Sequence, residues 1–518
     1  MTNINKYLYI AIACFFSLSM SSCLDDLNSS PIDDNIKTEF DAQSVYTKIY
    51  ASLALGGNEQ ADGSGDLDGI DGGASGFLRL LWNLNELPGD DVICAWSGDK
   101  PIFELNYQLF TSQNDFVRSF YYRLYFQLAM CNHYLSKTEG NDALTASRAE
   151  IRFMRALSYY YIVDLYGGGP FVDENSGIGS YHPPYINRVD LYNYVEAELL
   201  ACLPDLKDAR TNEYGKADKA AAWMLLSRLY LNAQVYTGKE NYAEAAKYAK
   251  QVIDAGYSLE PEYKHLFYAD NNTSNEFIFT INFDGVRSKT YGGTTFLLNS
   301  CMRGDMQTLQ LFGTLGAWGG NRARKALVTK FDDDASDKRA MFVIQPAEPD
   351  SKPRTLEIDE VSDFTQGYSI AKFSNLRKDG QPANDPAQQF ADTDFPLFRL
   401  AEALLTYAEA TVKSGGNVAG AVSAINQLRT RAQARQISAS ELLNPDLFFS
   451  IERSKELYLE GQRRTDLIRF GLFDEGVWDW KGGVKEGVKT PSYRKLYPIP
   501  ASDITSNPNL IDKQNPGY

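Results

Sequence analysis

Apolar residues recur at the 3.6-residue spacing of one helical face in several long segments of the chain. The clearest of these segments has its apolar positions at Ile151, Met154, Leu157, Tyr161 and Leu165. The glycines and proline at 167–170 cannot continue this pattern. The spacing therefore predicts one amphipathic helix that ends before Gly167.

Two further segments predict pairs of helices joined by a glycine turn. Residues 218–257 turn at Gly238, and alanines at 243, 245, 246 and 249 would let the second helix pack closely on the first. Residues 395–432 turn at Gly415 and Gly416. Helical pairs of about 34 to 40 residues with small and aromatic positions are typical of tetratricopeptide repeats. The predicted fold class is therefore mainly α, with a tetratricopeptide-like scaffold of helical pairs.

Between the helical segments lie long polar and glycine-rich stretches, notably residues 56–102 and 284–395. One short strand is predicted near them, because Phe277, Phe279, Ile281 and Phe283 alternate with polar or smaller residues. Loops of this length in a folded protein are usually functional. They predict a second, irregular lobe that is rich in loops and contains short strands.

These patterns divide one predicted unit, residues 41–518, into two parts. The helical scaffold covers approximately residues 41–55, 111–260 and 396–470. The loop-rich ligand lobe covers approximately residues 56–110, 261–395 and 471–518. No low-complexity linker separates the two parts, so we expect one multi-lobed unit.

The N-terminus, MTNINKYLYIAIACFFSLSMSSC, has the layout of a secretory signal over residues 1–22. Its apolar run from Tyr7 to Met20 is short for a membrane span. Residues 20–23 resemble a bacterial lipobox, which would place a lipid on Cys23, although an ordinary cleavage site is the alternative. The polar residues 23–40 would then be a lipidated tether. No second apolar stretch approaches the length of a span, so we expect membrane contact through the lipid anchor only.

Composition narrows the class of ligand. The formal net charge is −16, and it becomes −17 once Lys6 is lost with a signal that contains no acidic residue. An acidic protein is poorly suited to bind nucleic acid or anionic lipid, so a neutral ligand is expected. Tyrosine (32 residues) and phenylalanine (28 residues) are abundant, and tyrosine joins a flat apolar face to a hydroxyl.

Cysteine and histidine give little support for catalysis or metal binding. Cys94, Cys131, Cys202 and Cys301 lack metal-ligand spacing, and the three histidines, His133, His182 and His265, are scattered. Zinc and Ser/His chemistry are therefore poorly supported.

One tryptophan lies in a segment that cannot form a regular element. Trp318 in LGAWGGNR has Gly316 before it and Gly319 and Gly320 directly after it. It could fold back onto the core as a plug. Alternatively, it could be an exposed platform whose face the glycines leave clear.

A charged run near the C-terminal end of the scaffold allows two interpretations. Its members are Glu452, Glu456, Arg463, Arg464 and Asp466. Such residues could carry out acid/base catalysis, but they lie in a helical segment with the spacing of structural ion pairs. We favour the structural interpretation.

Several separate segments resemble one family, the SusD/RagB outer-membrane lipoproteins of the Bacteroidetes. They are the lipobox with DDLNSSP, AEIRFMRAL, GKADKAAAWMLLSRLYLNA, DFPLFRLAEALLTYAEA, INQLRTRA, ELYLEGQRRTDLIRFG and the closing YPIPASDITSNPNLIDKQNPGY. They run in the family's order over nearly the whole chain. DLDGIDGGASGF, NELPGDD, YGGTTFL and VWDWKGG are similar to its founding, starch-binding member. The resemblance implies a tetratricopeptide scaffold that sits as a lid on a TonB-dependent, SusC-like transporter and binds glycan without catalysis.

The resemblance also implies a binding site. Three aromatic rings that stack on a curved α-glucan would be Trp96, Tyr291 and Trp318, and the polar contacts would come from Arg79 and Asp99. Asp99 stands where the starch-binding relative has asparagine, and the loop that leads to Trp318 is three residues longer here. Sugar rings have apolar C–H faces and a polar rim, so aromatic platforms with a few polar groups suit them.

A calcium site is also implied. Asp392 and Asp394 in DTD match a calcium-binding position of the relative and offer hard oxygen ligands, with Asn272 as a third ligand where the relative has aspartate. The alternative is that these acids cap the following helix. No cofactor is otherwise required.

The sequence therefore predicts a lipid-anchored, cell-surface protein of the outer membrane that binds starch or another α-glucan and delivers oligosaccharides to a transporter. A fructan, another glycan or a peptide could be the cargo instead. A glycoside hydrolase and a purely structural assembly protein are alternatives from other classes.

Overall fold

A computed structural model describes residues 40–57, 61, 63–176, 181–304, 306, 308–345 and 352–518. The predicted signal segment 1–22, Cys23 and the tether up to residue 39 lie outside these residues. The chain divides into two units, Met1–Ser44 and Val45–Tyr518. The packing described below is that of the second unit.

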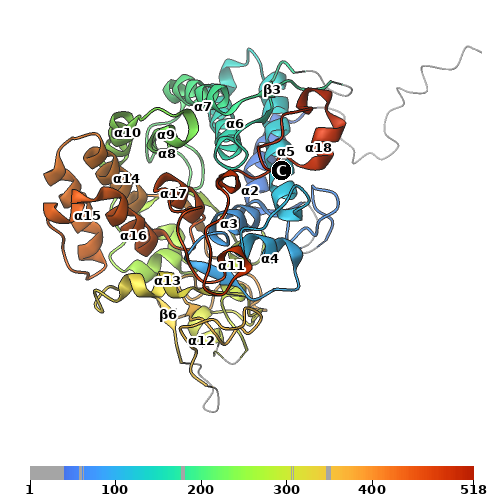
Figure 1. The fold of residues 1–518 in the computed structure, drawn as a ribbon. Coiled ribbons are helices and arrows are strands. Elements are labelled where there is room, and N and C mark those ends of the chain that lie inside the picture. The colour runs from blue at the N-terminus through green and yellow to red at the C-terminus, as the bar shows by residue number, and fades with distance from the viewer. Residues whose placement is uncertain are drawn as a thin grey trace, which may run out of the picture. The chain divides into compact units, whose positions relative to one another are not determined.

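Helices provide most of the regular structure (Figure 1). The α-helices are α2 (Ala42–Ala54), α3 (Phe77–Glu86), α4 (Lys100–Asn106), α5 (Asp115–Lys137), α6 (Thr145–Leu165), α7 (Arg188–Cys202), α8 (Lys219–Leu231), α9 (Ala233–Thr237), α10 (Tyr242–Asp254), α11 (Thr294–Ser300), α12 (Thr308–Phe312), α13 (Lys325–Val328), α14 (Leu400–Lys413), α15 (Val418–Arg431), α16 (Pro445–Leu457), α17 (Arg463–Arg469) and α18 (Ala501–Ser506). Short 3-10 helices are η2 (Asp142–Leu144), η3 (Leu203–Asp205), η4 (Tyr263–Phe267), η5 (Asn271–Thr273), η6 (Thr329–Phe331), η7 (Ala439–Leu443), η8 (Lys481–Gly483), η9 (Ser492–Lys495) and η10 (Pro508–Leu510).

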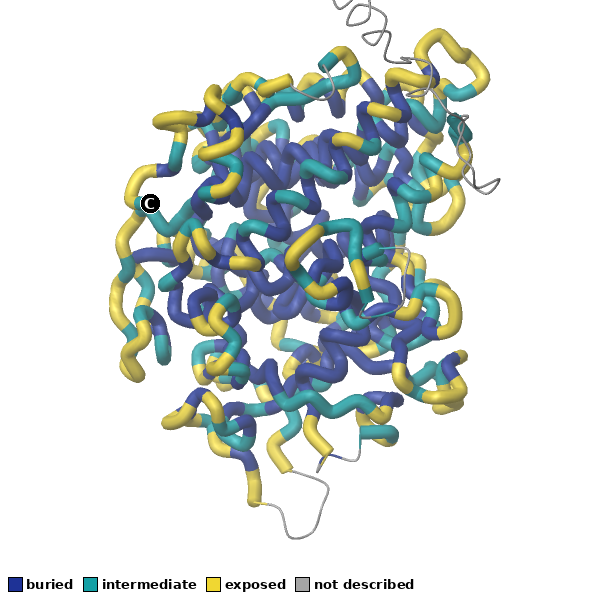
Figure 2. Tube along the Cα trace, turned by 90° about the vertical axis from the view of Figure 1, so that its right-hand side faces the viewer, coloured by how far each residue is buried: buried dark blue, intermediate teal, exposed yellow. Residues whose placement is uncertain are grey.

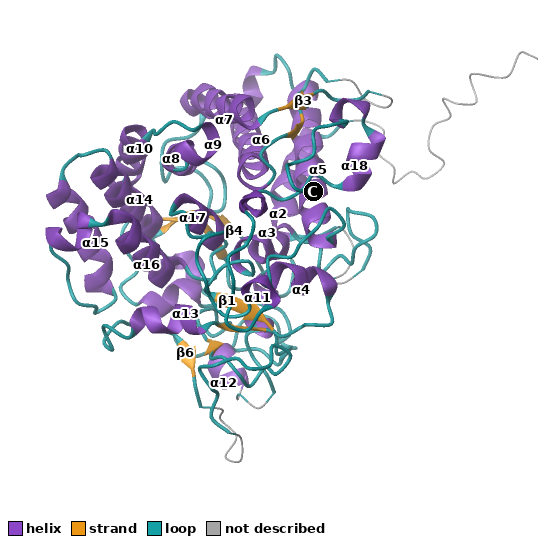
Figure 3. Ribbon diagram, viewed as in Figure 1, coloured by secondary structure: helices purple, strands orange, loops and turns teal. Residues whose placement is uncertain are grey.

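The strands are short and form antiparallel pairs (Figure 3). Their bounds are β1 (Val92–Cys94), β2 (Gly169–Pro170), β3 (Tyr185–Ile186), β4 (Phe277–Ile281), β5 (Asn321–Ala323), β6 (Phe342–Val343), β7 (Ser369–Ile370) and β8 (Phe395–Arg399). The pairs are β1 with β5, β2 with β3, β4 with β8 and β6 with β7. The mainly α prediction with short strands is confirmed.

The long helices pack on one another as a stack. α5 packs on α6, α6 on α7, α8 on α10, α10 on α14 and α14 on α15. The predicted turns are confirmed, because Gly238 ends α9 at φ 76° and Gly415 follows α14 at φ 72°. Of the alanines predicted to allow close packing, Ala245 and Ala249 are buried but Ala243 is exposed. Figure 2 shows buried residues along the helices and exposed residues mainly in the connections.

Asparagine and aspartate side chains fix where the stacked helices begin. Each accepts a backbone N–H from the first turn of its helix, and these residues are Asn114 for α5, Asn187 for α7, Asp218 for α8, Asn417 for α15 and Asn444 for α16. Such caps satisfy N–H groups that have no partner within the helix.

The predicted helix over residues 151–165 is part of α6, but it is not amphipathic. From Ala149 to Leu165 every residue except Arg152 is buried, because α5 covers one face and α7 another. Its polar side chains are paired inside the protein: Glu150 accepts hydrogen bonds from the Tyr46 and Tyr50 hydroxyls. The apolar spacing thus located the helix but not its second buried face.

Regular elements also occur in the stretches predicted as loops. Residues 56–110 contain α3 and α4, and every residue of α3 except Arg79 is buried. Residues 261–395 contain α11, α12 and α13. The predicted strand is confirmed as β4, and it pairs with β8 at the start of a segment predicted as helical.

Among the helices of the described residues, none is long and apolar enough to cross a bilayer.

The charged run at the end of the scaffold forms buried ion pairs, as the structural interpretation predicted. Most partners are distant in sequence, unlike neighbours on one helix: Arg339 and Arg429 for Glu452, Arg339, Arg399 and Arg431 for Glu456, Asp90 for Arg463, Asp164 for Arg464 and Arg453 for Asp466. These pairs join α16 and α17 to segments from the rest of the unit.

Glu456 is the centre of this network. It is fully buried, and its carboxylate lies 2.7 Å from Arg399 Nη1 and 3.3 Å from Arg339 Nη1. Burial alone would raise the pKa of Glu456, but Arg431, Arg399 and Arg339 outweigh burial and hold that pKa below its ordinary value. The glutamate is therefore charged in the folded state.

Replacing Glu456 with alanine leaves buried arginines without their counter-charge, so the free energy of unfolding should fall by about 3–5 kcal/mol. Asp254→Ala is the matched control, because it breaks the exposed Lys250–Asp254 pair on α10 and should cost less than about 1 kcal/mol. Urea denaturation of both variants measures the difference. Equal losses would show that the network does not stabilise the fold.

Candidate functional site

The pairing of β1 with β5 brings Trp96 and Trp318 together, although 222 residues separate them in sequence. Cys94 pairs with Asn321, and the ladder continues with a hydrogen bond from Ala95 N to Gly320 O (2.8 Å). Trp96 follows β1 and Trp318 precedes β5, and because the strands are antiparallel these two ends lie side by side. Their ring centroids are 6.4 Å apart at 45°, and Trp96 Nε1 donates to Trp318 O (3.3 Å).

The segment around Trp318 is tied to the end of α11. Trp318 N donates to Asn299 O (2.8 Å), and the next two N–H groups donate to Met302 O and Ser300 O. Trp318 is half-buried. It is therefore neither the core plug nor the freely exposed platform that the sequence allowed.

The two glycines after Trp318 are required by the backbone and by Trp96, and they do not serve to expose the Trp318 ring. Gly319 lies at φ 61°, which favours glycine. A Cβ on Gly320 would lie 2.7 Å from the Trp96 ring. These glycines allow the backbone to turn and the Trp96 indole to lie directly against it.

Tyr291 completes a row of three rings with Trp318 in the middle. Its ring centroid lies 5.6 Å from that of Trp318 at 67°, and its other neighbour is Phe390 at 5.1 Å. Tyr291 and Trp96 are half-buried, like Trp318. The structure thus brings together the three aromatic residues predicted from the resemblance; we call them the aromatic arc.

Arg79, on α3, lies under the arc. Its guanidinium carbon is 4.7 Å from the Phe296 centroid and 6.0 Å from the Trp96 centroid, and Nη1 donates to Gly73 O and Tyr291 O. Burial lowers the pKa of Arg79. Its Nε is buried and has no hydrogen-bond partner among the described residues.

Asp99 closes a turn that begins at Trp96, since its N–H donates to Trp96 O (3.1 Å). It is half-buried and precedes α4 without capping it through its side chain. Burial raises the pKa of Asp99, and the nearby Arg79 acts in the opposite direction. Both predicted polar residues therefore lie close to Trp96.

Sequence reasoning did not identify Phe296 and Phe390, which support the arc from below and from one side. Phe296 contacts Trp96 at 6.3 Å and the buried Trp82 at 5.4 Å. Both phenylalanines are buried, so in the sequence they resemble any core residue and carry no signal for a site.

The arc has the chemistry of a binding surface. It offers apolar ring faces beside one cation and one carboxylate, which suits a neutral ligand with a polar rim. The thiols of Cys94 and Cys301 are buried, and burial raises the pKa of each to about 12, so neither is a nucleophile at neutral pH.

The predicted calcium ligands do not offer free oxygens. Both carboxylates are buried, and their four oxygens accept hydrogen bonds of 2.6–2.8 Å from Gly285 N, Asn384 N, Phe283 N and the Tyr214 hydroxyl. Burial raises the pKa of Asp394 to about 7. Asn272 is exposed, and it is Asn271 that bonds the Asp394 backbone. Because every carboxylate oxygen already accepts a hydrogen bond, this arrangement gives no support to the calcium site, which stays a prediction.

The alternative interpretation of Asp392 and Asp394 as helix caps is wrong, because β8 follows Asp394 directly and α14 begins at Leu400. Within the part of the chain that the structure describes, no three His, Cys, Asp or Glu residues are grouped so that they could hold a metal ion.

Comparison with known proteins identifies close relatives. The family model described as the SusD family matches residues 337–518. The starch-binding protein SusD of Bacteroides thetaiotaomicron is 38% identical, with 98% of each chain covered. SusD-like protein P2 of Formosa agariphila is 29% identical over 97% of this chain and 98% of that protein. The surface glycan-binding protein A of B. thetaiotaomicron was solved with laminarihexaose and superposes on this chain with a TM-score of 0.70. The match covers 92% of this chain and 98% of that protein at 19% identity, which shows the same fold. The 38% identical relative is named a starch-binding protein, in agreement with the prediction that this chain is not an enzyme.

Gly320→Ala should push the Trp96 ring away from Trp318, because the added methyl would overlap the indole. Two indoles this close couple their electronic transitions, so the variant should lose the tryptophan couplet in circular dichroism. Gly98→Ala is the control, since a Cβ there meets no atom within 4 Å. An unchanged couplet in Gly320→Ala would contradict the packing described for the arc.

Proposed function

Because the chain belongs to the SusD family, we propose that it is a cell-surface protein that binds starch or α-glucan oligosaccharides on the aromatic arc and delivers them to a TonB-dependent, SusC-like transporter. The observation that carries the proposal is the contiguity of Trp96, Trp318 and Tyr291, with centroid separations of 6.4 and 5.6 Å. The relative that is 38% identical is named a starch-binding protein, which supports the choice of ligand.

The geometry of the arc favours a curved ligand. The Trp96 and Trp318 planes meet at 45°, and the Trp318 and Tyr291 planes meet at 67°. Rings that turn relative to one another can each stack on a successive sugar of a chain that bends, whereas a flat chain could lie on one of them at a time. Arg79 and Asp99 would then contact hydroxyl groups at the rim.

The arc also agrees with binding at a surface. The rings of the arc are held in place, because Trp96 packs on Phe296 and Tyr291 packs on Phe390. Each ring is only half-buried, so part of it stays accessible to a ligand. Rigid platforms lose little conformational entropy on binding. The net charge of −16 leaves neutral polysaccharide as the favoured class over nucleic acid.

A different glycan is the second candidate. A protein with the same fold was solved with laminarihexaose, and Asp99 differs from the residue of the starch-binding relative. An acidic side chain accepts hydrogen bonds but does not donate them when ionised, so it selects a different hydroxyl arrangement from asparagine.

Trp96→Ala and Trp318→Ala should each weaken amylopectin binding at least about thirtyfold, because a central tryptophan contributes about 2 kcal/mol or more. Native gels that contain amylopectin, a fructan or a β-1,3-glucan measure the affinity as retardation. Trp223→Ala on α8 is the control, since this half-buried tryptophan lies outside the arc.

Wild-type protein that migrates freely in amylopectin but is retarded by another glycan would contradict the starch assignment and retain the arc. Retardation by amylopectin that is as strong in both arc variants as in the wild-type protein would contradict the arc. Release of reducing sugar by the purified protein would favour the hydrolase alternative.

Lipid anchoring at Cys23 is part of the proposal and would place the protein in the outer membrane, facing outward. It rests on the lipobox-like residues 20–23, which lie outside the described residues. Cys23→Ala should abolish incorporation of an alkyne-tagged fatty acid in the native host and release the protein from membranes. Cys94→Ala, which alters a buried thiol, should leave labelling intact. Labelling that persists in Cys23→Ala would exclude this anchor.

A further inference from the structure

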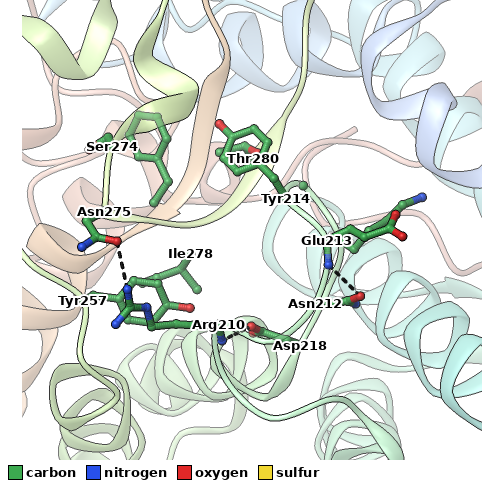
Figure 4. A pocket seen from close by; sticks show the side chains of 13 residues that line it. Arg210, Asn212, Glu213, Tyr214, Asp218, Tyr257, Ser274, Asn275, Ile278 and Thr280 are labelled. Atoms are coloured by element: carbon green, nitrogen blue, oxygen red, sulfur yellow. Dashed lines mark hydrogen bonds between the residues drawn. The ribbon is translucent and has the colours of Figure 1, made fainter.

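Tyr214 is an exposed aromatic residue that sequence analysis did not single out. It belongs to the loop of residues 210–218, before α8, and 44% of its surface is exposed. The loop stands between two hollows of about 230 and 260 Å³, and Tyr214, Gly215, Lys216 and Thr280 line both. Figure 4 shows the first hollow with Tyr214 and Thr280 at one side and Arg210 and Tyr257 below. The tyrosine thus forms part of the wall between the two hollows.

The hydroxyl of Tyr214 is anchored. It donates to Asp394 Oδ2 (2.8 Å), and the other oxygen of that carboxylate accepts Phe283 N (2.7 Å). Asp394 is buried. A side chain held at its tip cannot rotate freely, so the exposed part of the ring has a fixed orientation.

The backbone of the loop is also fixed. Gly215 lies at φ 78°, and a Cβ there would be 2.3 Å from Asn282 Nδ2. Lys216 Nζ lies 3.8 Å from the centroid of Tyr50, which docks the loop on α2. Asp218 accepts Arg210 N (2.7 Å) and caps α8. The site is therefore formed before any ligand arrives, which reduces the entropic cost of binding.

The walls of the first hollow have no net charge. Arg210 and Lys216 are balanced by Glu213 and Asp218. The remaining polar side chains are amides and hydroxyls, which both donate and accept hydrogen bonds. The Arg210 guanidinium carbon lies 5.5 Å from the Tyr257 centroid and turns toward Asn275 (Figure 4). A neutral ligand rich in hydroxyl groups matches this lining better than an ion does.

Size limits the ligand to a short piece. Each hollow is below the range of about 300–1,000 Å³ that is usual for drug-sized ligands. The second hollow also reaches Ser288, only three residues before Tyr291. Three residues span at most about 11 Å, so this hollow lies near the end of the aromatic arc.

We propose that Tyr214 and the two hollows form a second carbohydrate-binding site, which takes one or two sugar residues of the same neutral polysaccharide that binds the arc. The inference rests on the proposed function, because it takes the ligand class from there. Two sites on one polymer raise the affinity through effective concentration, although each alone is weak. Long chains should therefore use Tyr214 more than short oligosaccharides do.

Affinity gels with amylopectin, together with calorimetric titration with maltotriose, test the second site in the full-length protein. In a Trp96→Ala/Trp318→Ala background, adding Tyr214→Ala should weaken the remaining amylopectin binding by roughly tenfold, which corresponds to losing one stacked ring. Tyr214→Phe keeps the ring and should retain most of the affinity. In the wild-type background, Tyr214→Ala should reduce retardation by amylopectin and leave maltotriose binding at the arc unchanged.

Tyr181→Ala is the matched control, because Tyr181 is 42% exposed and lines neither hollow. If Tyr214→Ala behaves like Tyr181→Ala in both backgrounds while wild type binds amylopectin, the second site is refuted and the proposed function stands. If wild type binds none of the glycans tested, the proposed function fails and the second site falls with it.

Discussion

The candidate site depends on one backbone constraint, the antiparallel pairing of β1 with β5. Three residue pairs, from Val92 with Ala323 to Cys94 with Asn321, set the register of two segments that belong to different loops. A slip of one residue would turn every following side chain to the opposite face. Because Gly320 continues the ladder, Trp96 packs against glycine and its ring lies beside Trp318. Tyr291 and Arg79 then meet an arc whose first two members are already fixed.

A network of buried charges holds the surrounding segments in place. Glu456, in α16, and Glu460, three residues after the end of α16, both form ion pairs with Arg399. Glu460 also pairs with Lys372 at 2.7 Å. These contacts join the helical stack to the segments that carry β7 and β8. Burying so many charges is unfavourable unless each is paired, so the network permits few alternative arrangements. Ala323, in β5, forms a bridge with Tyr368 beside β7, so the β1–β5 pair that positions Trp96 and Trp318 is joined to this network.

The sequence predicted what local spacing determines and missed what distant contacts determine. The helices around Leu157 and the turns at Gly238 and Gly415 follow from apolar periodicity and glycine. α3 was missed although Arg79, Asn83 and Glu86 follow the spacing of one helical face, because this short helix lies within a glycine-rich stretch that was predicted as a loop. β8 was missed, because Phe395 pairs with Ile281, more than a hundred residues earlier. The arc residues were predicted from a family resemblance, whereas their approach to one another depends on the β1–β5 register. Tyr214 had no signal, since its anchor, Asp394, is distant in sequence.

The central claim is that a glycan stacks on Trp96, Trp318 and Tyr291 together. A crystal structure of the protein grown with maltoheptaose tests it most directly. The account predicts successive glucose residues that curve across the three rings, with hydroxyl groups within hydrogen-bond distance of Arg79 and Asp99. Maltoheptaose bound at another surface while the arc stays free, or rings displaced so that they no longer form a row, would contradict it.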